Sequence, residues 1–324
     1  MKILAAGYAA VMNLPERPMR WAQGRLRGGR LGWVFVAPNL AIFVLFSFLP
    51  IVIDVVYAGT GGSQLLPSER PYVGAENFAS LLDCTNHFDP NTCTRDLFWH
   101  GIWNTLRFVV FQVGLMLGFS LLTALVLNRK IIGRGFFRAI FFYPVLLSPV
   151  VVALIWKWIL QREGVLNAGF MAVGASPVNW LLDANWAFFW SVFISIWAHM
   201  GFYTLILLAG LQAIPAEIHE AAAMDATPPL RHFRRITWPL LMPSVLVVFV
   251  LGLIRAVQMF DEIYVLTGGG PGTATTFIVQ YIYKTGFADG VRQYGLAAAA
   301  SLLLASVLLV LTLLQLKGQR AKNG

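Results

Sequence analysis

The side chains that could do chemistry in this chain of 324 residues are few, and they form no catalytic set. The stretch HEAAA at 219–223 begins like the zinc-binding helix pattern H-E-x-x-H, in which two histidines four residues apart hold the metal. The second histidine position is Ala223, so the pattern is incomplete and predicts no metal site. The other histidines show no ligand spacing among themselves: His87, His100, His199 and His232.

Motifs for phosphate binding and nucleophilic catalysis are also missing. The glycine-rich stretch TGGGPGTAT, residues 267–275, has no lysine and no predicted strand before it, so it is not a P-loop that would bind ATP. No Gly-x-Ser-x-Gly elbow occurs. We therefore expect no catalytic residues, and a membrane enzyme built around His199 is kept only as a minor alternative.

The elements that must position the polar residues are membrane spans. The chain is 58% hydrophobic and 12% charged, whereas soluble domains have about a quarter charged residues. A helix needs roughly 20 apolar residues to cross the hydrocarbon core, and the short alternating segments of a membrane barrel are absent. We predict an all-α integral membrane protein with about six transmembrane helices, near residues 33–57, 103–127, 138–160, 187–210, 239–260 and 294–316.

The net charge of +9 is distributed as in a membrane protein and not as in a nucleic-acid-binding one. With six spans both termini lie on one side, and that side holds sixteen of the 24 basic residues, so by the positive-inside rule it is cytoplasmic. These residues are Lys2, Arg17, Arg20, Arg25, Arg27, Arg30, Arg129, Lys130, Arg134, Arg138, Arg231, Arg234, Arg235, Lys317, Arg320 and Lys322.

The topology divides the chain into a cytoplasmic N-terminal tail (1–32), a transmembrane domain (33–316) and a cytoplasmic C-terminal tail (317–324). The arginines that follow the apolar stretch ILAAGYAAVM argue for a retained tail and against a signal peptide. The tail is either an amphipathic segment on the membrane surface or poorly ordered, and the sequence leaves both open.

Both cysteines, Cys84 and Cys93, lie in the long loop 58–102 that this topology places outside the cytoplasm, where a disulfide is allowed. A bridge between them is one expectation, and two inert thiols are the other. The loop is also acidic, which is typical of a solvated surface and less often of a docking site. Its acidic residues are Glu69, Glu76, Asp83, Asp89 and Asp96.

The stretch EAAAMDATPPLRHFRRITWPLLMP, residues 220–243, begins in the predicted cytoplasmic loop 211–238 and continues into the fifth span. Pro215 suits the first turn of a helix through the alanine-rich segment that follows. Thr227 followed by Pro228 is typical of a helix N-terminus, so a second short helix is expected there. We expect Pro239 and Pro243 to redirect the chain into the fifth span.

This stretch closely resembles the EAA loop of permease subunits of binding-protein-dependent ABC importers. Four further segments resemble the maltose-type sugar permeases: YVGAENFASLL (72–82), FFYPVLLSPVVVALIWKWIL (141–160), LAGLQAIPAEIHEAA (208–222) and FDEIYVLTGGGPGTATT (260–276). The positions that match the EAA pattern are Glu220, Ala221, Ala222, Asp225, Phe233, Ile236, Pro239 and Pro243.

The resemblance implies a type I ABC importer permease, a bacterial inner-membrane subunit that does no chemistry. ATP and Mg would be bound by a dimeric cytoplasmic ATPase, which receives the EAA loop as a coupling helix. A second permease chain would share the path of a sugar or oligosaccharide delivered by a periplasmic binding protein. Glu220 and Asp225 would contact the ATPase, with Ala221 and Ala222 allowing close approach. The alternative is a six-helix secondary transporter or channel, which would need no EAA loop.

One position departs from the family pattern: the glycine expected after Asp225 is Ala226. A positive φ there would strain an alanine by about 1 kcal/mol, so we expect a helical turn in this chain.

Arg255 is a basic residue within the fifth span, with no acidic residue in its own apolar run. It either snorkels to the outer interface or faces a water-filled path. Asp261 is six positions further on, which on one helix is the wrong face for pairing. We hypothesise that the unmatched Arg255, with Lys157, lines a path for an anionic solute, and we add Asp261 and Trp156 to this predicted path.

Overall fold

The computed structural model describes residues 30–129 and 131–323 of the chain. Residues 1–29, which make up most of the predicted N-terminal tail, lie outside the described part, as do Lys130 and Gly324. The described elements are helices, with two isolated β-bridges at Thr60–Tyr72 and Cys84–Cys93. The chain divides into two units, residues 1–57 and residues 58–324.

The first unit contains one helical span interrupted by a π-turn. Helix α3 (Arg30–Phe43) leads into the π-turn Val44–Phe48, and α4 (Leu49–Ala58) follows directly. The Leu49 N–H donates to the Val44 carbonyl, five residues back. Pro50 comes next, and a proline ring has no N–H and presses on the carbonyl four residues before it. The π-turn therefore lies at the position where an α-helical turn would bring the proline ring against that carbonyl.

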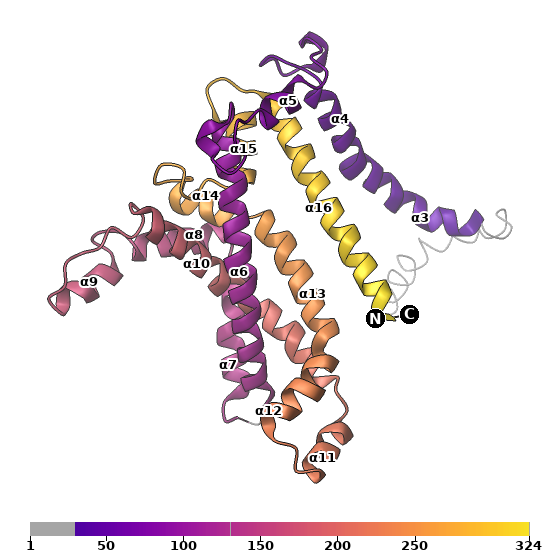
Figure 1. The fold of residues 1–324 in the computed structure, drawn as a ribbon, viewed down its shortest axis with the longest axis vertical. Helices are drawn as coiled ribbons and strands as arrows, with labels where there is room; N and C mark the ends of the chain where they lie inside the picture. The colour runs from indigo at the N-terminus through magenta and orange to yellow at the C-terminus, as the bar shows by residue number, and fades with distance from the viewer. Residues whose placement is uncertain (1–29, 130, 324) are drawn as a thin grey trace, which may run out of the picture. The chain divides into compact units, whose positions relative to one another are not determined.

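The second unit is a bundle of spans joined by shorter helices (Figure 1). Over the described residues of the whole chain, five helices are long and apolar enough to cross a membrane, and one bent pair makes a sixth candidate. The all-helical prediction of about six spans is thereby confirmed. The five are Val36–Ala58, α6 (Asp96–Asn128), α10 (Ala184–Gln212), the continuous run Pro229–Val257, and Tyr294–Gln315 within α16 (Tyr294–Asn323).

The third predicted span, 138–160, is wrong as a single helix. Helix α7 (Arg134–Phe142) passes through a 3₁₀ turn, Tyr143–Leu146, before α8 (Pro149–Ile159), and the two parts are bent by 101°. Ser148 precedes a proline, which disfavours helical backbone, and it has the extended ψ of 138°. Pro149 then starts α8 in the first-turn position that proline tolerates.

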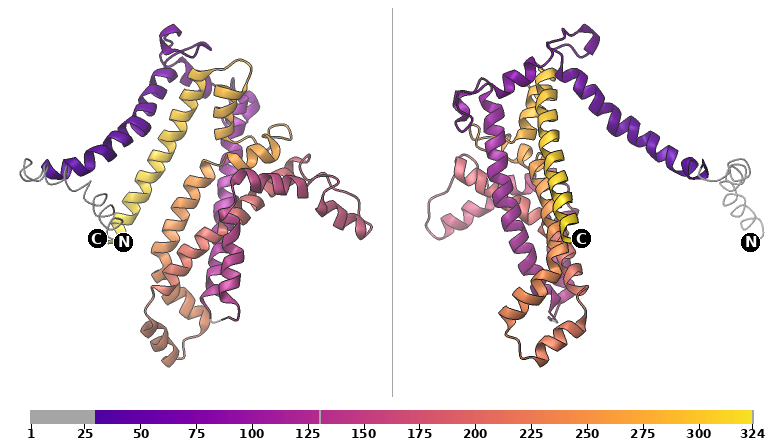
Figure 2. Two further views of the ribbon diagram at one scale, coloured as in Figure 1. Left: turned by 180° about the vertical axis from the view of Figure 1, so that it is seen from behind. Right: turned by 45° about the vertical axis from the view of Figure 1, so that its right-hand side comes forward.

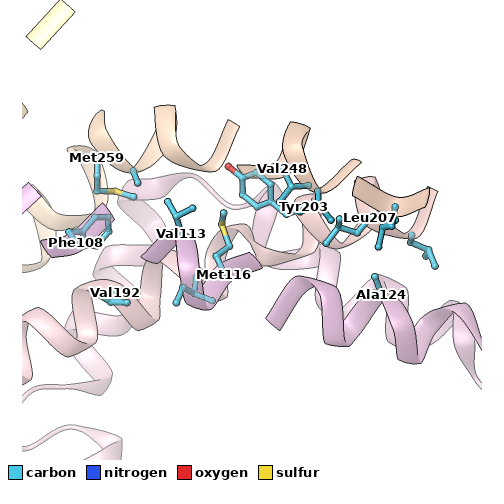
Figure 3. Close-up of a cluster of buried hydrophobic side chains, with 14 of the residues drawn as sticks. Phe108, Val113, Met116, Ala124, Val192, Tyr203, Leu207, Val248 and Met259 are labelled. Atoms are coloured by element: carbon cyan, nitrogen blue, oxygen red, sulfur yellow. The ribbon is translucent and has the colours of Figure 1, made fainter. Parts of the chain in front are cut away.

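The hydrophobic core of the second unit lies between α6, α10 and α13 (Trp238–Val257). Figure 3 shows side chains from these helices meeting: Phe108, Val113, Met116 and Ala124 from α6, Val192, Tyr203 and Leu207 from α10, and Val248 from α13. Small residues allow the close approach that membrane helices need, since a side chain at Gly201 would run into the backbone carbonyl of Phe141.

The glycine-rich segment 268–277 is a hydrogen-bonded loop between α14 (Asp261–Thr267) and α15 (Ile278–Tyr283). Asn104 of α6 donates to the carbonyls of Thr273 (2.6 Å) and Thr276 (3.1 Å), and the hydroxyl of Thr275 donates to the Gly270 carbonyl (2.7 Å). The polar groups of the loop thus form hydrogen bonds with one another and with α6, so its glycines have a structural role.

The loop before α6 is shorter than the predicted 58–102, because α6 begins at Asp96 and not near residue 103. It carries two 3₁₀ turns, Pro67–Glu69 and Pro90–Thr92, and helix α5 (Glu76–Leu82). All five acidic side chains of the predicted cap are exposed. A disulfide joins Cys84 to Cys93 with a Cα–Cα distance of 4.0 Å.

A disulfide that closes a loop of about ten residues is expected to contribute about 2 to 3 kcal/mol to the stability of this loop. Alkylation of the membrane-extracted protein without reductant should label neither cysteine, and reduction should expose two thiols to mass spectrometry. A Cys84→Ser variant is the control, because it leaves Cys93 free and should show one label. Two labelled thiols in the unreduced wild type would contradict the bond.

Candidate coupling loop and intramembrane ion cluster

The loop after α10 forms two short helices that extend beyond the ends of α6, α10 and α13 (Figure 2). They are α11 (Ala216–Met224) and α12 (Pro229–His232), which confirms the prediction of a helical pair. Pro215 precedes the first helix, and α12 begins one residue later than predicted, with Pro228 in the N-cap position.

Helix α11 presents the acidic residues of the EAA pattern to the outside. Glu220, Ala221 and Asp225 are exposed, and no ion pair within the described residues uses either carboxylate. Ala222 is 6% exposed, so it packs within the chain, and only Ala221 of the two alanines is open to a partner. Met224 beside them is 89% exposed.

The expectation of a helical turn at Ala226 is wrong, because this residue has φ +47°. The Thr227 N–H donates to the Ala222 carbonyl and the Ala226 N–H to the Ala223 carbonyl, both at 3.0 Å. These two bonds make a Schellman motif, which ends a helix with one left-handed residue, usually glycine. Hydrogen bonding of the last carbonyls of α11 therefore outweighs the strain on the alanine. Ala226 is the one non-glycine residue with positive φ among those described.

Replacing Ala226 by glycine is expected to stabilise the loop by up to about 1 kcal/mol, because glycine adopts left-handed backbone without the Cβ clash. Ala226→Val is expected to destabilise it, since a branched side chain adds to the same clash. The rate of limited proteolysis between α11 and α12 measures both. Faster cleavage of the glycine variant than of wild type would contradict a left-handed Ala226.

The entry into the fifth span also differs from the prediction. Helix α12, the π-turn Phe233–Thr237 and α13 run on without a break, so Pro239 and Pro243 do not redirect the chain. The reversal occurs earlier, between α11 and Pro229. Pro239 occupies the first turn of α13 and is exposed, and the π-turn stands directly before it. Phe233 is half-buried, with its ring 6.1 Å from that of Trp238.

A histidine pair ties α11 to α12. His219 Nδ1 lies 3.0 Å from His232 Nε2, and one ring must donate while the other accepts. A pair with both rings protonated has no acceptor and cannot make this bond. In the sequence the two histidines show only that they lack metal-ligand spacing. Their positions in the two helices of an expected hairpin, 13 residues apart, were the signal for this contact.

Arg255 is not unmatched, which corrects the premise of the anionic-path hypothesis. Its Nη2 lies 3.5 Å from Glu262 Oε1 and also contacts His199 Nε2. The side chain of Glu262 is 3% exposed and that of Arg255 is 43% exposed. We call these three residues the ion cluster. It joins α10, α13 and α14.

The hydrogen bonds of His199 determine its part in the cluster. Its Nδ1 lies 2.9 Å from the Ser195 carbonyl, which can only accept, so Nδ1 carries a proton. In the neutral ring Nε2 is then an acceptor for the Arg255 guanidinium. A neutral histidine thus shares the arginine with the buried carboxylate. Arg255 thereby bridges two helices from the end of α13.

The other predicted path residues do not join the ion cluster. Lys157 donates from Nζ to the Val265 carbonyl at 3.3 Å, which links α8 to α14. Asp261 is exposed at the start of α14. Trp156 packs against the rings of Trp190, Phe193 and Trp197 at 5.4 to 5.6 Å, so it belongs to an aromatic cluster of α8 and α10.

Glu262 and the contact with His199 were not predicted from the sequence. Glu262 is seven positions after Arg255, which corresponds to the same face of a helix two turns on. A continuous helix would hold the two about 10 Å apart. The break between Val257 and Asp261 brings them together. The described residues hold no group of three His, Cys, Asp or Glu side chains that could bind a metal ion.

A family comparison decides the identity of the chain. Residues 114–321, which include α11 and the ion cluster, match the family described as "Binding-protein-dependent transport system inner membrane component". This chain is a permease of a binding-protein-dependent ABC transporter. The permease is similar to the trehalose/maltose transport system permease protein MalF of Thermococcus litoralis, with 34% identity over 92% of this chain and 97% of that one.

Two further similarities agree with this assignment. The permease is 32% identical to the lactose transport system permease protein LacF of Rhizobium radiobacter, over 90% of this chain and 95% of that one. Its fold matches a chain in the crystal structure of a bacterial ABC transporter involved in the import of the acidic polysaccharide alginate. The TM-score is 0.76 with 25% identity, over 90% of this chain and 95% of that one.

Membership has direct consequences for chemistry and partners. The permease belongs to the sugar-permease group of the family and is a non-catalytic component of the inner membrane. It carries no cofactor of its own, because ATP is bound by the partner ATPase. An ATPase and a periplasmic binding protein are its partners. The alternatives of a membrane enzyme, secondary transporter or channel therefore fall away.

Proposed function

We propose that this permease forms, with a second permease chain, the path of an ATP-driven importer for a sugar or oligosaccharide, and that α11 couples the path to a dimeric ATPase. The exposed face of α11 carries this proposal. It presents Glu220, Ala221 and Asp225 on a helix that extends beyond the bundle, and neither carboxylate has an ion-pair partner among the described residues. Such a surface suits a complementary groove on another protein.

The topology proposed from the sequence places α11 and both termini in the cytoplasm. The support is the basic residues near α7 and α12 and at the end of α16, set against the acidic, disulfide-bonded loop at the opposite ends of α6 and α16. The tails at 1–32 and 317–324 and the boundaries of the transmembrane domain remain part of this proposal.

A second permease chain is supported by the span in the first unit. The described segment Val36–Ala58 has a mean hydropathy of 2.5, and a single helix cannot cover its own apolar faces. Lipid or other helices must therefore surround it. We propose that a partner permease supplies some of these helices and shares the path.

The proposed substrate is a saccharide, and the named relatives and the alginate transporter support this class. We propose that Arg255 borders the path, because its side chain is 43% exposed although its Glu262 partner is buried. Lys157 on α8 and Asp261 on α14 are exposed as well. Trp156 holds α8 against α10 through its aromatic contacts. With Arg255 already paired to Glu262, a preference for anionic saccharides rests mainly on the alginate transporter likeness.

Co-purification and uptake test the proposal together. Tagged permease extracted from the membrane in mild detergent should bring with it an ATPase and a second permease chain. A strain lacking the gene should fail to grow on the transported saccharide, and a panel of neutral and uronic-acid oligosaccharides would identify its class. Purification of the permease alone, with normal growth of the deletion strain on every saccharide tested, would refute the proposed function.

A further inference from the structure

Two arginines of α7 share one acceptor at the end of α10. Arg134 Nη2 lies 2.8 Å and Arg138 Nη2 lies 3.0 Å from Gln212 Oε1, with the amide in the orientation that these bonds require. Gln212 is the last residue of α10 and stands four residues before α11. Two positive groups thus converge on one neutral oxygen.

The charges at this place are not balanced by the protein. Neither arginine forms an ion pair with a carboxylate of the described residues. The Nε atoms of both are buried and make no hydrogen bond. Since buried donors are normally satisfied and like charges repel, the pair suits an anion with several acceptor oxygens.

The surroundings of the pair indicate a membrane lipid. Arg134 and Arg138 are one turn apart and lie on the same face of α7. Beside them the large apolar side chains of Phe136, Phe137 and Ile140 are 67%, 42% and 49% exposed. A short helix with basic residues on one face and exposed phenylalanines next to them suits the interface between headgroups and acyl chains. An acidic protein surface would leave these apolar side chains uncovered.

We infer that Arg134, Arg138 and Gln212 form a binding site for the phosphate of an anionic glycerophospholipid. The two guanidinium groups take the phosphate oxygens, for which arginine's planar fork is suited. The acyl chains lie along Phe136, Phe137 and Ile140. Basic pockets between membrane helices are known to hold anionic headgroups in this way. The bound lipid would brace the end of α10 immediately before the coupling helix.

Lipid retention by the full-length permease tests the site. The protein is purified in detergent, mixed with phosphatidylglycerol or phosphatidylcholine, and examined by native mass spectrometry. Wild type should retain phosphatidylglycerol preferentially. The variant Arg134→Gln/Arg138→Gln should bind it about 30-fold more weakly, since each basic residue near an anionic surface contributes about 1 kcal/mol. The matched control Arg162→Gln/Arg292→Gln removes two exposed charges from the loops after α8 and before α16, and it should bind as wild type does.

A second variant keeps the test valid if the Arg134→Gln/Arg138→Gln protein does not fold. Arg134→Lys/Arg138→Lys keeps both charges and loses the guanidinium forks, so it should retain less phosphatidylglycerol than wild type. Equal retention by wild type and the lysine variant, or equal loss in the control, would overturn the inference. Unchanged lipid binding with loss of the co-purifying ATPase would also overturn it and would assign the arginines to a protein contact. Saccharide uptake plays no part in this readout, so the result is independent of the proposed substrate.

Discussion

Replacing Glu220 by lysine is expected to abolish saccharide uptake while leaving the permease in the membrane. Glu220 is exposed on α11, so its substitution disturbs no packing within the chain. Reversing a charge that pairs across a protein interface costs roughly 2 to 5 kcal/mol, which weakens ATPase binding by about 30-fold or more. The measurements are the amount of ATPase that co-purifies and the initial rate of uptake. Asp225→Lys should act in the same direction.

Glu163→Lys is the matched control for this charge reversal. Glu163 is also exposed, but it follows α8 in a loop distant along the chain from α11. It should retain both the ATPase and uptake. If Glu220→Lys kept wild-type ATPase binding and transport, or if Glu163→Lys lost as much, α11 would not be the coupling element.

Replacing Arg255 by glutamine is expected to lower the stability of the permease by up to about 3 kcal/mol, because it leaves the buried Glu262 carboxylate without its cationic partner. This loss of stability is at the low end of the range for breaking a buried ion pair, because the Arg255 side chain is 43% exposed. Glu262→Gln should also destabilise. The double variant Arg255→Gln/Glu262→Gln should recover most of the loss, since it removes both charges together. Thermal unfolding in detergent measures all three.

Recovery in the double variant separates an ion pair from two independent contacts. Additive losses would show that Arg255 and Glu262 act separately. A variant Arg255→Gln as stable as wild type that has lost only the uptake of anionic saccharides would return Arg255 to the role of a substrate ligand. Stability and uptake therefore need to be measured on the same preparations.

Much of the architecture follows from the sequence, because lipid imposes one strong requirement. A span must be long, apolar and helical, so the apolar runs predict five spans nearly as they occur. The failure at 138–160 has a local cause. Pro144 and Pro149 lie within an apolar run, and hydropathy does not register the backbone N–H that each removes. The two prolines by themselves predict a break in the helix there.

Some site residues could likewise be predicted from the sequence, and others could not. Glu220 and Asp225 could be predicted because a local helical pattern of fixed spacing carries them. The ion cluster could not, because His199 and Arg255 are 56 residues apart in the chain and meet only when α10 packs against α13. The position of Ala226 shows a third case. The backbone preference of alanine favours a helical turn, but the hydrogen bonds to the final carbonyls of α11 stabilise the left-handed conformation.

The π-turn Phe233–Thr237 also sets the direction in which α11, the proposed coupling helix, points. A π-turn contains one residue more than the α-helical turn it replaces, and one residue corresponds to about 100° of rotation around the helix axis. Compared with a regular helix, the residues before Phe233 are therefore rotated by about 100° relative to α13. Deleting one residue of the turn together with Pro239→Ala would restore a regular helix. The exposed face of α11 would then swing by roughly a quarter of a revolution around the fifth span. Glu220 and Asp225 would then be retained but would face away from the groove proposed on the ATPase.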